Sequence, residues 1–152
     1  MRKTKGFTLV ELLIVIIIIG ILAGMMMLSS GAATDKAEAT KIVSNLRNIK
    51  AAAIMFYADE NKWDFTSELD LHGTDAKAVA IAKYLDKKPD DGYVLAKADE
   101  KISVGYTKVL PGVASKLSLM AANAGLRNAA ITSADVTSAD QVISTAVYMV
   151  VN

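Results

Sequence analysis

The feature that most constrains this chain is an apolar run without a charged side chain, LLIVIIIIGILAGMMML, from Leu12 to Leu28. Phe7 to Val10 extends the run upstream of Glu11. As a helix, the segment from Phe7 to Leu28 would be about 33 Å long at 1.5 Å per residue, which matches the roughly 30 Å hydrocarbon core of a bilayer. The run therefore predicts a helix that enters a membrane.

The charges on either side of this run predict its orientation. Arg2, Lys3 and Lys5 precede it, and no Lys or Arg follows until Lys36. Because positive side chains favour the cytoplasmic side, we expect a single pass through the inner (cytoplasmic) membrane, with the remainder of the chain outside. Membrane lipid is thus the first predicted partner of the apolar segment.

The composition excludes several other chemistries. The 152 residues suit one small domain and contain no cysteine, which rules out disulfides, thiolate metal sites and thiol catalysis. The 17 basic and 16 acidic side chains give a net charge of +1, which provides no reason to expect a nucleic-acid partner. Stability must come from packing.

Glu11 is the residue that ordinary membrane segments leave unexplained. A carboxylate one turn inside an apolar helix costs about 2–4 kcal/mol at depth, so it is rare without a partner or a function. A cleaved secretory signal would end in a small-residue site after an apolar region of roughly 7–15 residues. A permanent anchor and a buried helix of a soluble domain give Glu11 no role either.

The segment Lys5-Gly6-Phe7-Thr8-Leu9-Val10-Glu11 resembles the class III signal of type IV pilin-like proteins, the pilins and pseudopilins. The resemblance extends to about Ser30 and fades beyond it. It implies that a prepilin peptidase cuts after Gly6 and methylates the amine of Phe7. It also implies that an inner-membrane assembly platform polymerises the chain with copies of itself, as an extracellular or periplasmic filament.

The charges of this motif are consistent with that assembly. Cutting after Gly6 creates a cationic amine at Phe7, which could neutralise Glu11 of a neighbouring copy. Loss of one partner would leave an uncompensated charge that costs about 3–5 kcal/mol. Many relatives carry a proline further along the helix, whereas Met25 to Leu28 has none, so helix unwinding between Gly20 and Gly31 stays open.

Beyond Gly31 the sequence predicts that the helix continues to about Asp59. Apolar residues recur there at steps of three and four, with charged residues between them, as in an amphipathic helix. We divide the chain into a leader at 1–6, a membrane or filament-core helix half at 7–31, an amphipathic half at 32–61, and a head at 62–152. The predicted apolar stripe consists of Ala39, Ile42, Val43, Leu46, Ile49, Ala53 and Phe56.

The expected fold class is α+β, a pilin-like ladle. Its long N-terminal helix has a protruding apolar half and packs on one face of a small antiparallel sheet, whose other face meets water. The expected head elements are a helix capped by Thr74 or Asp75 and running to about Leu85, a hairpin of Tyr93–Lys97 and Ile102–Thr107, a helix over Val113–Ala124 closed by Gly125, and a strand within Val142–Val151. The tail from Ala130 should dock by burying Val142, Ile143, Val147 and Val150.

Other conspicuous residues are interpreted as structural. His72, the single histidine, is predicted to lie in a surface loop, and Trp63, Phe65, Tyr93 and Tyr106 to pack against the core. We predict no catalytic residue, no enzyme activity and no cofactor. Calcium is the alternative that we weighed for Asp90, Asp91, Asp99 and Glu100 and for the TSAD repeats at 132–135 and 137–140.

The leading hypothesis is a structural subunit of a type IV pilus or related filament. The sequence does not distinguish adhesion, surface motility, DNA uptake or secretion. The first alternative is a type II secretion pseudopilin. The second is a monomeric, membrane-anchored extracellular binding protein, whose function would not require Glu11.

Overall fold

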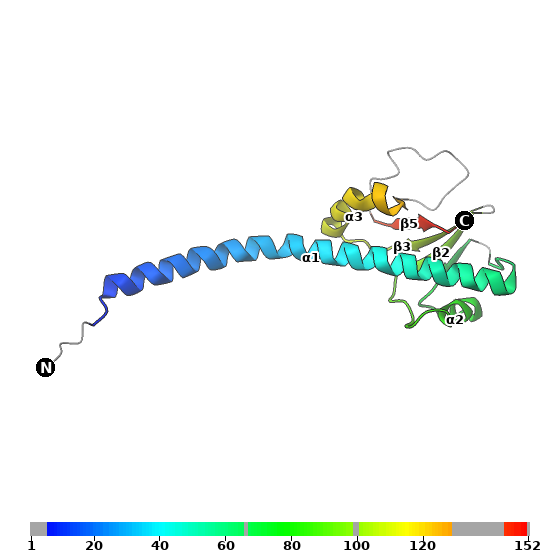
Figure 1. Ribbon diagram of the computed structural model, residues 1–152, viewed down its shortest axis with the longest axis horizontal. Coiled ribbons are helices and arrows are strands. Elements are labelled where there is room, and N and C mark those ends of the chain that lie inside the picture. The colour runs from blue at the N-terminus through cyan, green and yellow to red at the C-terminus, as the bar shows by residue number, and fades with distance from the viewer. Residues whose placement is uncertain (1–5, 66, 99–100, 129–144, 152) are drawn as a thin grey trace. The chain divides into compact units, whose positions relative to one another are not determined.

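The computed structural model describes residues 6–65, 67–98, 101–128 and 145–151 (Figure 1). The chain divides into two compact units, Met1–Thr34 and Asp35–Asn152. The first unit is the apolar part of one long helix, and the second contains the head. The prediction of a long N-terminal helix with a small antiparallel sheet is confirmed.

The helix α1 runs from Leu9 to Glu60, so it begins two residues after Phe7 and ends one residue after the predicted Asp59. It is long and apolar enough to cross a membrane. Every side chain from Gly6 to Met27 is exposed, so this unit buries nothing by itself. The backbone is helical from Gly20 to Gly31, so the stretch that lacks a proline is not unwound in this structure.

The second half of α1 supplies the core of the head. All residues of the predicted stripe are buried, and Leu46 and Ala53 are fully so. Burying one Leu or Ile side chain contributes about 1.5–3 kcal/mol relative to leaving it exposed, so this stripe is a principal source of head stability. In Figure 1, α2 (Ala76–Ala82) and α3 (Pro111–Ala124) lie on opposite sides of α1.

The described residues form one five-stranded antiparallel sheet in the order β1-β2-β3-β5-β4. Its register aligns Leu95, Val104, Met149 and Leu126 across neighbouring strands, and all four are buried in the core with α1. The predicted hairpin is confirmed. The strands are β1 (Glu68–Asp70), β2 (Tyr93–Ala98), β3 (Lys101–Tyr106), β4 (Leu126–Arg127) and β5 (Val147–Val150).

The outer face of the sheet corrects one expectation. Val94, Ala96 and Tyr148 form a second buried cluster there, so this face does not simply meet water. Tyr148 pairs with Gly105, and its ring occupies the space that a Cβ at Gly105 would need. Because Gly105 has no side chain, an aromatic ring can lie flat over the backbone of β3. The alternating pattern alone did not predict this packing.

The helix α2 is shorter than predicted. It runs from Ala76 to Ala82 and does not reach Leu85. Asp75 is its N-cap, and its carboxylate accepts the main-chain N–H of Lys77 at 2.8 Å. At the other end the N–H groups of Tyr84 and Leu85 bond three residues back, so the chain tightens into a 3₁₀-type turn instead of adding α-helical residues.

The helix α3 runs from Pro111 to Ala124 and ends as predicted at Gly125, whose φ of 66° is left-handed. Its N-cap, Leu110, makes no side-chain capping bond. The half-buried carboxylate of Asp35 on α1 lies against Gly112, the second residue of α3. A negative charge at this end of a helix is favourable, so Asp35 ties α3 to α1.

The C-terminal tail is described in part. Val147 is buried and Val150 is partly buried in β5, as expected, whereas Val142 and Ile143 lie outside the described residues. β5 occupies Val147–Val150 of the predicted segment, and Thr145 and Ala146 are not part of the ladder. The short strands β1 and β4 were not predicted, since segments of three and two residues are too short to show alternation.

Replacing Gly112 by Ala should lower the free energy of unfolding by about 1–3 kcal/mol, because the new Cβ would collide with the Asp35 carboxylate. Urea unfolding of the full chain in detergent, followed by Trp63 fluorescence, measures the change. Gly31→Ala is the matched control, since a Cβ there meets no atom within 4 Å. An equal loss in an Asp35→Ala background would contradict the steric explanation.

Candidate functional site

The candidate site is the start of α1 and the residues just before it. Gly6 and Phe7 precede the helix, and 87% of the Phe7 side chain is exposed. A Cβ at Gly6 would meet no atom within 4 Å, and Gly6 does not have the positive φ that favours glycine. The fold therefore does not require glycine here, and any requirement must come from something that acts on the chain.

Glu11 lies in the first turn of α1, where it forms a capping box with Thr8. The main-chain N–H and the hydroxyl of Thr8 donate to Glu11 Oε2 at 2.7 and 2.8 Å. In return, the main-chain N–H of Glu11 donates to Thr8 Oγ1 at 3.3 Å. Two otherwise unpaired donors at the helix start are thereby satisfied, and the carboxylate is held at the positive end of the helix dipole.

This geometry leaves part of the carboxylate available. Both bonds from Thr8 end on Oε2, and within the described part of the chain no group bonds to Oε1. The capping box would survive a cut after Gly6, because the Phe7–Thr8 amide is retained. Glu11 can thus cap its own helix and still accept one further donor.

Thr8 is the residue of this site that sequence reasoning missed. Its role depends on the spacing Thr-x-x-Glu, which is a sequence signature of a capping box ahead of an apolar run. The free-energy cost of a carboxylate in an apolar run predicts a partner for Glu11 on a neighbouring copy. It does not predict the local bonds of Glu11 to Thr8. The local role occupies Oε2 of Glu11.

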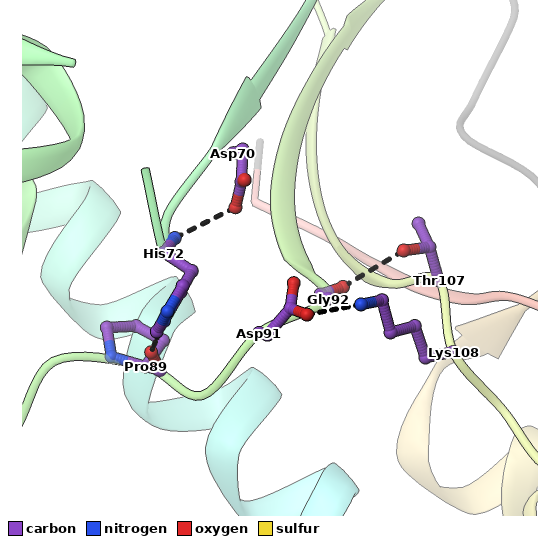
Figure 2. A network of polar contacts seen from close by, with 7 residues as sticks. All are labelled: Asp70, His72, Pro89, Asp91, Gly92, Thr107 and Lys108. Carbon is purple, nitrogen blue, oxygen red and sulfur yellow. Dashed lines mark hydrogen bonds and ion pairs between the residues drawn. The ribbon is translucent and has the colours of Figure 1, made fainter. Parts of the chain in front are cut away.

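His72 lies in an exposed polar network (Figure 2). Its main-chain N–H donates to Asp70 Oδ1 at 2.9 Å, and its Nδ1 lies 3.2 Å from the carbonyl oxygen of Pro89. Lys108 bonds Asp91, and this bond lowers the pKa of the Asp91 carboxyl. The network connects three loops, which agrees with a surface position for His72.

The acids weighed for calcium are divided between described and undescribed parts of the chain. Asp90 Oδ2 lies 3.7 Å from Lys41 Nζ, and Asp90 Oδ1 lies 3.6 Å from Lys87 Nζ. Asp91 bonds Lys108. Asp99, Glu100 and the TSAD repeats lie outside the described residues. Within the described residues no three His, Asp or Glu side chains gather as a metal site, and calcium binding elsewhere stays untested.

The four aromatic residues assigned to packing do pack on the core, as predicted. Tyr93 is buried, and its hydroxyl accepts a 2.9 Å hydrogen bond from Asn45 Nδ2. Trp63, Phe65 and Tyr106 are partly buried against the same core. Trp63 also stacks on Tyr57, with ring centroids 5.2 Å apart, at the end of α1.

Replacing Thr8 by Ala should loosen the first turn of α1 by about 0.5–2 kcal/mol, because the hydroxyl that accepts the N–H of Glu11 is lost. Amide hydrogen exchange of Leu9 to Leu12, on the full chain in detergent micelles, measures this opening. Thr8→Ser keeps the hydroxyl and should exchange like the wild type. Equal exchange in Thr8→Ala would show that the capping box does not hold the turn.

Comparison with known proteins places these observations in context. Residues 1–27 match the family model of the prokaryotic N-terminal methylation motif. The type II secretion system core protein G of Klebsiella michiganensis is 29% identical, over 80% of this chain and 84% of that protein. The core protein G of Escherichia coli is 26% identical, over 79% of this chain and 81% of that protein.

Type IV pilus proteins are similar as well. The type IV wide pilus major component PilA4 of Thermus thermophilus is 41% identical over 63 residues, which cover 41% of this chain and 48% of that protein. The structure of the major type IV pilin PilA1 from Clostridium difficile matches with a TM-score of 0.55 at 18% identity, over 79% of this chain and 98% of that one. The chain therefore has a prokaryotic N-terminal methylation motif, sequence similarity to core proteins G and to a type IV pilus component, and the fold of a type IV pilin.

Proposed function

We propose that this chain is a structural subunit of a type IV pilus or a related filament. A prepilin peptidase cuts it after Gly6, Phe7 is N-methylated, and an inner-membrane assembly platform polymerises the product with copies of itself through α1. The head then lies outside the cytoplasm, in an extracellular or periplasmic filament. Its role is structural, without catalysis.

One observation carries this proposal. A carboxylate lies at the start of an apolar helix, and the chain itself does not cover that helix. The side chains from Gly6 to Met27 are all exposed in the single chain, so lipid or other apolar helices must cover them. Glu11 interrupts this surface near its start, in the capping box with Thr8. Any apolar cover must therefore also supply a cation to Glu11.

The processed N-terminus provides that cation. A secondary ammonium at methylated Phe7 keeps its positive charge and two N–H donors. Because Thr8 bonds only Oε2 of Glu11, Oε1 can accept the ammonium of a neighbouring copy. Only an axial register that brings the two charges together avoids a buried unpaired charge, which would cost about 3–5 kcal/mol.

Replacing Glu11 by Ala or Gln should leave cleavage intact and abolish filaments, because the neighbour's ammonium loses its counter-charge. The test is to shear host cells and to analyse the sheared fraction by intact mass and electron microscopy. Wild-type filaments should consist of subunits that begin at N-methylated Phe7. Glu38→Gln, a change of an exposed carboxylate on the same helix, is the matched control and should assemble normally.

Two results would contradict this proposal. Filaments of normal yield from Glu11→Ala would remove the charge pair from the mechanism. An uncut wild-type chain that stays in the membrane without filaments would instead leave the monomeric, anchored binding protein as the better reading.

A type II secretion pseudopilin is the second candidate, because the core proteins G are similar over about four fifths of the chain, whereas the similarity to PilA4 covers 41%. Deleting the chain from its host separates the two. Loss of sheared surface filaments with normal protein secretion is expected of a pilus subunit. Loss of exported enzymes from the medium, with surface filaments retained, is expected of a pseudopilin.

A further inference from the structure

The head carries a cationic groove of about 570 Å³ between α1, the end of α3, and strands β4 and β5. Arg47 and Lys50 of α1 line it together with Arg127 of β4. Its remaining lining is mostly apolar and includes Ile54, which is 48% exposed. Among the described residues that line the groove there is no carboxylate, and three positive charges surround an apolar floor.

These three cations differ from the lysines that the head pairs internally. In the described part of the chain, the ion pairs join Lys41 and Lys87 to Asp90, Lys77 to Asp64, and Lys108 to Asp91. None of the ion pairs between described residues includes a cation of the groove. The groove therefore presents positive charge that the described head does not neutralise.

The C-terminal end of α1 has the opposite character. Asp59 and Glu60 are its last two residues, both exposed, and its last turn contains no basic residue. The negative end of the helix dipole adds to these two charges, so a cation is favoured at this position. The hydrogen bond from Tyr84 to Asp59, then burial, and then the charges of Asp59 and Glu60 raise the pKa of the Tyr84 hydroxyl.

Within one chain, the cationic groove cannot contact the acidic C-terminal end of α1. Lys50 and Glu60 are ten residues apart on one helix, about 15 Å at 1.5 Å per residue, which exceeds the combined reach of their side chains. Two copies of the groove cannot face each other either, because six cations would meet. The complementary contact must therefore join two different surfaces of two copies, which is the kind of contact that propagates into a filament.

We propose that the cationic groove of one copy binds the C-terminal end of α1 of a neighbouring copy, with Lys50 and Arg47 against Asp59 and Glu60. This inference rests on the proposed function, because the filament holds the heads at high effective concentration. Exposed Tyr57, one turn before Glu60, provides an apolar side chain for the floor of the groove. The contact is heterologous and repeats along the filament.

Carbodiimide cross-linking of sheared filaments tests this contact, because the reagent joins an amine directly to a carboxylate. The expected product is a peptide that links Lys50 to Asp59 or Glu60, and it should be absent when the subunits are dissociated in detergent before the reaction. Filaments without this link, or with Lys50 joined to another carboxylate, would overturn the inference alone. A wild-type strain without filaments would reject the proposed function, and this inference with it.

Charge reversal provides a second test. Glu60→Lys should reduce filament yield roughly tenfold, since it places a cation against the groove. The combined change Lys50→Glu with Glu60→Lys should restore most of the yield, whereas Lys36→Glu, a reversal outside the groove on the same helix, should have no effect. Because a cation favours the end of α1, Glu60→Lys should leave the melting temperature equal or higher. Unchanged filament yield in Glu60→Lys would refute the contact.

Discussion

The burial of one stripe of α1 beneath the antiparallel sheet is the interaction on which the rest of the head depends. Leu46 and Ile49 enter the same core as Leu95 and Val104, so the helix is an internal wall of the head and not an appendage. The chain has no disulfide to replace this packing. Two polar residues of α1 add contacts to the head. Asp35 lies against the start of α3, and Asn45 donates a hydrogen bond to the hydroxyl of Tyr93.

The surroundings of α1 differ between its first and second halves, and this difference explains most of its sequence. Between Phe7 and Met27 every side chain is exposed, so this composition does not serve the described core of the head, and the segment is long and apolar enough to cross a membrane. From Ala39 to Phe56 the buried apolar residues lie on one stripe of the helix, and the charged residues lie outside it. Glu11 is the exception that has to be explained, and its capping box with Thr8 explains how the carboxylate is held while one of its oxygens remains available.

Repeating patterns that extend over a whole helix or hairpin could be recognised in the sequence. Contacts between particular residues that are distant in sequence could not. The amphipathic spacing from Ala39 to Phe56 located the core face, and the polar break after Lys97 located the hairpin. The strands β1 and β4 are too short for alternation, and the ring of Tyr148 over Gly105 depends on a pairing between residues distant in sequence. Glu11 was identified because a carboxylate within an apolar run has a high free-energy cost. The groove of Arg47, Lys50 and Arg127 could not be found, because it joins α1 to β4 through the fold.

The position of β5 in the sheet has a consequence for how the head is made. Among the described strands β5 comes last in sequence, yet it lies between β3 and β4 and is the strand to which both are bonded. In a chain that is synthesised from its N-terminus, β3 keeps an unpaired edge until β5 is made, and β4 has no strand to pair with before then. Such open edges invite pairing with other chains. The sheet is therefore complete only after β5 has been made, and a copy without β5 would carry the open edge of β3 into any assembly that it entered.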